Sequence, residues 1–144
     1  MKPRVVFAAL AIWLLAAGLA QAERLAVKVP KANVRSGPGT EHAVIWQVEQ
    51  YYPVKVIERK GAWCLFEDFE GDRGWLHNSL LGKLETVVVA KNNCNLRAGP
   101  GTDHPVVLVA DAGVPFRVLE RRGQWLRVRH ADGETGWIAR TLVW

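Results

Sequence analysis

Short stretches in which apolar and charged residues alternate recur along the chain. Residues 116–118 read Phe-Arg-Val and residues 126–129 read Leu-Arg-Val-Arg, which is the period-two pattern of a half-buried β-strand. Residues 54–56 and 64–67 repeat the pattern, less cleanly because Leu65 interrupts it. No stretch after the first 22 residues carries an apolar 3.6-residue period long enough for a helix. The pattern therefore predicts an all-β protein.

Turns that contain glycine separate the predicted strands. A strand is also predicted at residues 87–89, with a weaker counterpart at residues 25–29. Short strands with turns every 8–12 residues are typical of a small barrel or sandwich. The turns that we predict as hairpin connections lie at residues 60–61, 70–71, 122–123 and 132–133.

The chain contains two ungapped copies of one sequence, offset by 62 residues. Residues 33–40 (NVRSGPGT) recur as residues 95–102 (NLRAGPGT), and 18 of the 50 aligned positions are identical to the end of the chain. A copy of about 60 residues is near the lower size limit for a domain with its own core. The copies can therefore pack on one another through a short junction at residues 81–85. The two predicted domains span residues 23–82 and 83–144.

The order of motifs in each copy resembles the bacterial SH3 (SH3b) family. That order is N-[VL]-R-x-G-P-G-T, an apolar strand, a G-x-W strand and a G-x-x-G-W hairpin, and it occurs twice within residues 25–144. The resemblance implies a partly open β-barrel of about five or six strands for each copy. Members of the family usually occur as accessory modules of cell-wall hydrolases or as tandem modules of exported proteins. The expected fold is two tandem SH3-like β-barrels after an N-terminal signal peptide.

The first 22 residues have the layout of a secretory signal peptide. Lys2 and Arg4 precede an apolar run at residues 5–19, and Ala-Gln-Ala then supplies small residues just before Glu23. The alternative is a membrane anchor that stays attached. The run of 15 residues is shorter than the roughly 18 to 20 needed to cross a bilayer. We expect cleavage before Glu23 and export to the periplasm, with membrane contact only through an uncleaved signal segment.

Charge and export together argue against a nucleic-acid partner. Removal of the first 22 residues lowers the formal net charge from +5 to +3. The one notable basic cluster is formed by Arg121, Arg122, Arg127 and Arg129. A nucleic-acid protein would need a clearer basic stripe than this.

The two Gly-Pro-Gly loops are interpreted as structural. Proline fixes its own φ, and the flanking glycines allow positive φ or close backbone approach. The loops lack the Lys-Ser/Thr of a phosphate loop, and no helix follows them. The asparagine before each loop can bond back to the loop backbone, and the arginine can lie over the barrel wall or pair with an acid. The motif residues are Asn33, Arg35, Gly37, Pro38, Gly39, Asn95, Arg97, Gly99, Pro100 and Gly101.

Aromatic residues are the candidate ligand-binding residues, because SH3-like barrels commonly hold extended peptides in exposed aromatic grooves. Trp63 and Trp125 alternate with core positions and are predicted on the outer face. Trp75 and Trp137 are predicted at a hairpin edge. For these shared pairs we favour the alternative in which each ring seals the end of its barrel. The copies need not bind alike, because three candidates have no aromatic counterpart in the second copy: Trp46, Tyr51 and Tyr52.

The two cysteines belong to different copies. Cys64 is in the core phase of its strand and Cys94 precedes Asn95. Their counterparts are small or apolar, which favours two buried thiols that behave as hydrophobic residues. Export favours instead a disulfide that would staple the two barrels.

His42 and His104 occupy equivalent loop positions, each beside one acid. One histidine and one acid per barrel are too few ligands for a metal site, unless the two loops meet across the junction. We expect no metal and no cofactor.

The sequence offers no catalytic arrangement. A peptidase needs a Cys or Ser nucleophile with a histidine base, and the strand phase of Cys64 points inward. Glu67, Asp68, Glu70 and Asp72 share one hairpin, interpreted as a solvated turn rather than the acid pair of a glycosidase. We predict a non-catalytic binding module for a peptide or for peptidoglycan stem peptides. The alternative is a structural adaptor that contacts another envelope protein and has no wall affinity.

Overall fold

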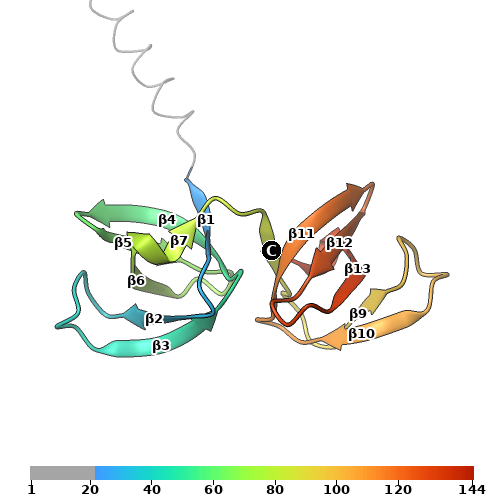
Figure 1. The fold of residues 1–144 in the computed structure, drawn as a ribbon, viewed down its shortest axis with the longest axis horizontal. Helices are drawn as coiled ribbons and strands as arrows, with labels where there is room; N and C mark the ends of the chain where they lie inside the picture. Colours follow the sequence, from blue (N-terminus) through green and yellow to red (C-terminus); the bar gives the residue numbers. More distant parts are fainter. Residues whose placement is uncertain (1–21) are drawn as a thin grey trace, which may run out of the picture.

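In the computed structural model, residues 22–144 form two β-barrels side by side (Figure 1). The predicted signal peptide, apart from Ala22, lies outside the described residues. Within residues 22–144, no helix has the length and apolar character needed to cross a membrane. The predicted all-β class and the two-barrel arrangement are confirmed.

The first barrel is a seven-stranded sheet in the order β3-β2-β6-β5-β4-β1-β7, and its neighbouring strands are antiparallel. A 3₁₀ turn, η1 (Asn78–Leu80), precedes the last strand. The strands are β1 (Arg24–Val27), β2 (Lys31–Arg35), β3 (Val44–Glu49), β4 (Pro53–Lys60), β5 (Trp63–Glu67), β6 (Arg73–His77) and β7 (Leu81–Gly82).

The second barrel repeats this order without the last strand, as β10-β9-β13-β12-β11-β8. The 3₁₀ turn η2 (Arg140–Leu142) is the counterpart of η1. In both barrels the strand that follows the Gly-Pro-Gly loop, β3 or β10, lies at an edge of its sheet. The strands are β8 (Thr86–Val88), β9 (Cys94–Arg97), β10 (Val106–Ala110), β11 (Pro115–Arg122), β12 (Trp125–Arg129) and β13 (Thr135–Ala139).

Each barrel has its own core, and the largest core residue sits on a different strand in each. Phe66 on β5 fills the first core, and its counterpart in the second barrel is Val128. Phe116 on β11 fills the second core, and its counterpart is Val54. All four side chains are fully buried. The two barrels therefore enclose similar apolar volume with the phenylalanine and the valine exchanged.

The two barrels also pack directly on one another. Val88 of β8 is fully buried in the core of the first barrel, and Trp144 packs partly buried against the same core. From β1, Arg24 Nη2 donates to the carbonyl oxygen of Thr86 at 3.3 Å. The guanidinium carbon of Arg24 lies 4.2 Å from the ring centroid of Trp144, a cation–π arrangement. The junction is thus a packed contact rather than a loose linker.

Candidate functional site

A cleft of about 810 Å³ lies at the edge of the first barrel, and we call it the first groove. One wall is residues 46–49 of the edge strand β3, and another is the hairpin at residues 68–72. Residues 112–114 of the second barrel line the remaining side. The groove combines the half-buried ring of Trp46 with several carboxylates.

The second barrel carries the counterpart of this cleft, a hollow of about 330 Å³ that we call the second groove. Eight of its nine lining residues are the counterparts, 62 positions later, of residues that line the first groove. Its walls are again the edge strand, at residues 108–110, and the hairpin at residues 130–134. Trp46 is replaced by Leu108, so the second groove lacks an aromatic wall from the edge strand.

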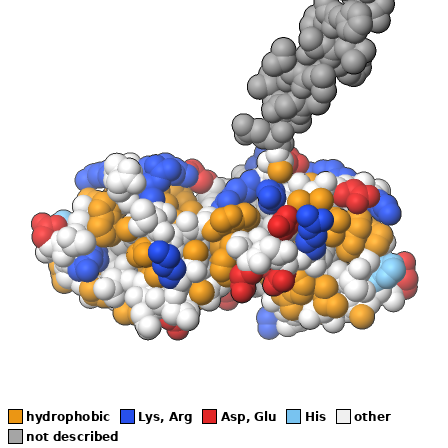
Figure 2. All heavy atoms as spheres, turned by 180° about the vertical axis from the view of Figure 1, so that it is seen from behind, with side chains coloured by type: hydrophobic (Ala, Val, Ile, Leu, Met, Phe, Trp, Pro, Cys, Tyr) orange, Lys and Arg blue, Asp and Glu red, His pale blue; other side chains and the backbone are white. Residues whose placement is uncertain are grey.

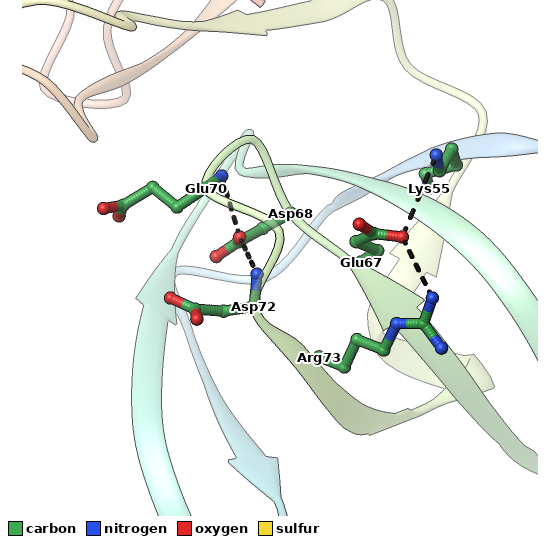
Figure 3. Close-up of polar contacts among 6 residues, drawn as sticks. All are labelled: Lys55, Glu67, Asp68, Glu70, Asp72 and Arg73. Carbon is green, nitrogen blue, oxygen red and sulfur yellow. Dashed lines mark hydrogen bonds and ion pairs between the residues drawn. The ribbon is translucent and has the colours of Figure 1, made fainter.

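Asp68 is the best-ordered acid of the first groove, because three donors hold its carboxylate (Figure 3). Its Oδ2 accepts from the Tyr52 hydroxyl at 2.8 Å, and its Oδ1 accepts from the backbone N–H groups of Glu70 and Asp72, both at 3.0 Å. The residue is only 6% exposed. Burial and the bond to Asp68 raise the pKa of Tyr52, so its hydroxyl stays a donor at all ordinary pH values.

The interpretation of the whole acidic hairpin as a solvated turn is therefore wrong for Asp68. Glu67 points to the other side of the hairpin, where its Oε2 lies 3.9 Å from Lys55 Nζ and 3.5 Å from Arg73 Nη2 (Figure 3). Glu70 and Asp72 remain in the groove wall. Of the four acids in the hairpin, one is structural, one forms surface ion pairs, and two face the groove.

His130 takes the position of Asp68 in the second barrel. Its ring lies 3.0 Å from Asp132 Oδ1 through Nδ1, and 3.2 Å from Glu49 Oε1 of the first barrel through Nε2. The ring also packs edge-on against Phe116, with centroids 5.6 Å apart. Sequence reasoning missed this residue, although one signal was available: positions 68 and 52 both change between the copies, from Asp with Tyr to His with Val.

Of the seven candidate aromatic residues, the structure brings Trp46 and Tyr52 together at the first groove. Tyr52 is buried and contributes its hydroxyl to Asp68, so Trp46 is the accessible member of the pair. The Trp46 ring meets Phe66 edge-on, with centroids 6.1 Å apart. Tyr51 is half-buried, with a positive φ of 77° at the turn after β3, and does not line the groove.

The four tryptophans that the copies share lie away from the grooves. Trp75 and Trp137 fall within β6 and β13, directly after the hairpins, and are only 9% and 7% exposed, which agrees with the favoured structural role. The neighbouring Leu76 and Ile138 point into the barrel cores, so strand alternation places both tryptophan rings on the opposite face. Trp63 and Trp125 are half-buried. Their role as ligand contacts stays a prediction.

The arginine of each Gly-Pro-Gly loop binds the loop itself. Arg35 Nη1 donates to the carbonyl oxygens of Thr40 at 3.1 Å and His42 at 2.9 Å. Arg97 Nη1 donates to the carbonyl oxygen of His104 at 3.0 Å. Both arginines therefore hold the loop backbone, in the structural role that we expected, and neither pairs with an acid there.

The loop glycines allow a histidine ring to lie against the backbone. A Cβ atom on Gly37 would lie 2.5 Å from His42 Nδ1, and one on Gly99 would lie 2.5 Å from His104 Nδ1. The two histidines thus fill space within their own loops. Among the described residues, no three His, Cys, Asp or Glu side chains are grouped so that they could hold a metal ion.

Asn33 has a different partner from the one predicted. Its Oδ1 accepts from Gln47 Nε2 at 2.7 Å, a bond across β2 and β3 rather than back to the loop. The prediction was wrong because register, which brings Asn33 opposite Gln47, is set by the sheet and not by the local turn.

Cys64 and Cys94 are free and buried. Each thiol lies in the core of its own barrel, so the alternative of a disulfide between the barrels is not realised. Burial raises the pKa of both thiols, which keeps them in the unreactive protonated form at neutral pH.

The predicted basic cluster is largely neutralised by acids. Arg121 pairs with Glu85, and Glu120 pairs with Arg122 at 3.0 Å and with Arg127 at 3.1 Å. On the face drawn in Figure 2, basic and acidic side chains are interspersed with hydrophobic ones, with no continuous basic stripe.

Comparison with known proteins finds sequence similarity to segments of longer bacterial proteins. The chain is 23% identical over 128 residues to the Bacillus subtilis protein "Putative N-acetylmuramoyl-L-alanine amidase YrvJ", a match that covers 81% of this chain and 24% of YrvJ. It is 36% identical over 53 residues to the Staphylococcus epidermidis protein "Probable cell wall amidase LytH", over 36% of this chain and 18% of LytH. The chain thus spans about a quarter or less of the relatives it matches.

Among solved structures, the chain is similar to an NlpC/P60 family protein from Bacillus cereus, at 17% identity and a TM-score of 0.37. That match covers 85% of this chain and 56% of the other. The model of the bacterial SH3 domain matches twice, at residues 28–83 and 90–144. With the same sheet order and the same groove in both halves, the chain belongs to the bacterial SH3 domain family, in two tandem copies.

Proposed function

We propose that this chain is a non-catalytic, exported binding module that recognises a peptide, such as the stem peptides of peptidoglycan, in the cell envelope. The observation that carries the proposal is the recurrence of one groove at equivalent positions of both barrels. Membership of the bacterial SH3 family and the similarity to segments of proteins named as cell wall amidases support it.

The shape of the first groove suits an extended peptide. It runs along β3, an edge strand whose only partner within the described residues is β2. An edge strand offers free backbone donors and acceptors, which an extended peptide can pair with. Trp46 adds an apolar surface, and Glu49, Glu70 and Asp72 add negative charge. Their charge favours a peptide that carries an amino group over one rich in carboxylates.

The alternative is an adaptor that contacts another envelope protein and does not bind the wall. The observation that favours it is a set of exposed apolar side chains on the same edge strands, each about half exposed: Val44, Ile45, Val106, Val107 and Val109. Apolar side chains in such a cluster often mark a protein interface.

A pull-down of the exported protein on purified peptidoglycan tests the proposal. Trp46→Leu installs the residue of the second groove, and we expect it to reduce retention at least several-fold while thermal unfolding stays close to wild type. Trp63→Leu is the matched control, because it makes the same change outside the groove and should leave retention intact.

Loss of retention in Trp63→Ala and Trp125→Ala, but not in Trp46→Leu, would move the site to the outer-face tryptophans. If the wild-type protein is not retained at all, wall binding is ruled out and the adaptor remains.

N-terminal sequencing of the protein recovered from the periplasmic fraction tests export. We expect the chain to start at Glu23. A chain that starts at Met1 would refute cleavage before Glu23 and point to a retained anchor.

A further inference from the structure

His130 and Glu49 form an ion pair between the two barrels, with Nε2 and Oε1 3.2 Å apart. Among residues 22–144 it is the only ion pair that joins one barrel to the other. It also connects the two grooves, because His130 lines the second groove and Glu49 lines the first. The side chain of His130 is only 22% exposed, so the contact is partly shielded from solvent.

The other contacts between the barrels do not change charge near neutral pH. They are the buried Val88, the cation–π contact of Arg24 with Trp144, and the bond from Arg24 to the Thr86 carbonyl oxygen. Arginine stays protonated at all these pH values. Histidine, by contrast, changes charge between pH 5 and 8. His130 is therefore the titrating element of the interface.

Acids surround the ring of His130. From β11, the apolar ring of Phe116 packs against the ring of His130. The charged groups that face the ring or its partner are Asp132 and Glu134 of its own hairpin, Asp111 at the end of β10, Glu49 of the first barrel, and Lys31 opposite Glu49 on β2.

The number of N–H groups on the ring decides how many of these acids it can bind. The imidazolium has two N–H donors and can donate to Asp132 and Glu49 together, across the two distances of 3.0 and 3.2 Å. The neutral ring has one N–H and one acceptor nitrogen. It can donate to one carboxylate only. The backbone N–H of Asp132 lies 3.3 Å from Nδ1, so the neutral ring can accept there and keep its Nε2–H on Glu49, but it loses the positive charge of the ion pair and the bond to the Asp132 carboxylate.

We propose that His130 is a pH-sensitive latch, which as imidazolium fastens the second barrel to Glu49 at the wall of the first groove, and as neutral imidazole loosens this contact because the charge of the ion pair is lost. Residues 112–114 of the second barrel form one side of the first groove, so loosening the contact changes the width of that groove. The latch does not depend on which ligand the groove holds.

The direction of the pH dependence follows from the surroundings of the ring. Burial by itself lowers the pKa of His130, but the hydrogen bonds to Glu49 and Asp132 outweigh burial and raise it above the ordinary 6.5. A raised folded-state pKa means that the contribution is complete below about 6.5 and is lost as pH rises through the folded-state value. The latch is therefore closed in acid and open in alkali.

NMR of the exported protein tests the latch without any ligand. Residual dipolar couplings report the relative orientation of the two barrels, and we expect one orientation at pH 5.5 and a broader distribution at pH 8.5. His130→Gln should remove this difference, because the glutamine amide does not change charge between the two pH values. His42→Gln is the matched control, since its ring packs within its own loop, and it should behave as wild type.

A second measurement tests the latch even if the His130→Gln variant folds poorly. The ring protons of His130 give its pKa directly, and Glu49→Gln should lower that pKa, because it removes one of the two carboxylates that raise it. The latch is refuted if Glu49→Gln leaves the pKa of His130 unchanged. It is equally refuted if the barrel orientation is the same at both pH values, or still changes in His130→Gln.

Discussion

The hairpins at residues 68–72 and 130–134 share one backbone and differ in chemistry. In the first, the N–H of Asp68 donates to Asp72 O at 2.9 Å; in the second, the N–H of His130 donates to Glu134 O at 2.8 Å. What differs is the residue that faces the hairpin from the turn after the edge strand. Tyr52 supplies a hydroxyl that keeps Asp68 within its barrel. The counterpart Val114 has no hydroxyl. His130 pairs instead with Asp132 of its own hairpin and with Glu49 of the first barrel.

The comparison shows how a duplicated barrel acquires two different sets of hairpin contacts without changing its fold. The turn geometry is fixed by backbone bonds that any residue can make. The chemistry is fixed by a pair of positions, 52 with 68 and 114 with 130, which must suit each other. The cores follow the same logic, since Phe66 with Val54 and Phe116 with Val128 are two solutions for one space.

The largest expected effect on stability comes from exchanging the core residues in which the two barrels differ. Phe66→Val leaves a cavity and should lower the free energy of unfolding by about 2–4 kcal/mol. Val54→Phe overfills the same core and should lower it by about 1–3 kcal/mol. The double variant reproduces the arrangement of the second barrel, so its loss should be smaller than the sum by about 1 kcal/mol or more. Urea unfolding measures all three.

The reciprocal exchange, Phe116→Val with Val128→Phe, is the matched control in the second barrel and should show the same coupling. Strictly additive losses in both barrels would mean that the two positions do not fill a common space.

A smaller effect is expected from removing the hydroxyl that distinguishes the first hairpin. Tyr52→Phe leaves Asp68 Oδ2 buried without its side-chain donor, and should cost about 1–3 kcal/mol of stability. Tyr51→Phe removes a hydroxyl from the neighbouring half-buried residue and should change stability by less than about 0.5 kcal/mol. Thermal unfolding of the two variants side by side distinguishes them.

Giving the second hairpin the residues of the first tests whether the two positions must suit each other. His130→Asp places a carboxylate beside Asp132 and Glu49 and should destabilise the protein, while His130→Asp with Val114→Tyr supplies the missing hydroxyl and should recover part of the loss. No recovery in the double variant would mean that the pairing of these positions does not govern the hairpin.

The smallest effect is expected where the barrels agree. Arg59 pairs with Glu23, and Arg121 pairs with Glu85 at the equivalent place. Both pairs are about half exposed, so Glu23→Gln and Glu85→Gln should each cost about 1 kcal/mol or less. The loss should shrink further in 1 M salt, where the Debye length is about 3 Å. A loss well above this in one variant alone would show that the two pairs are not equivalent.

Sequence reasoning predicted the strands well because their signals are local. Alternation placed the strands, and the turn glycines Gly61 and Gly123 do adopt positive φ, both at 55°. Repetition at an offset of 62 then predicted two copies of one barrel. The same local rules could not decide how exposed the Trp75 ring is, because its burial on β6 depends on segments that are distant in the sequence.

The site was less predictable, because its contacts join distant residues. Tyr52 lies 16 residues from Asp68, and Glu49 lies 81 residues from His130. Only the sheet order brings the first pair together, and only the packing of the barrels brings the second. Trp46 was identified from the sequence as an aromatic residue without a counterpart, but its place in a groove depends on the fold of the hairpin opposite.

Val88, a residue of the second sheet buried in the core of the first barrel, has a consequence for any long ligand. Because Val88 anchors the second sheet in the first core, it sets the separation of the two grooves. A polymer that occupies one groove reaches the other at high effective concentration only if its own repeat matches that separation. We therefore expect the tandem pair to favour ligands whose repeat matches the separation of the grooves, in addition to ligands of suitable chemistry.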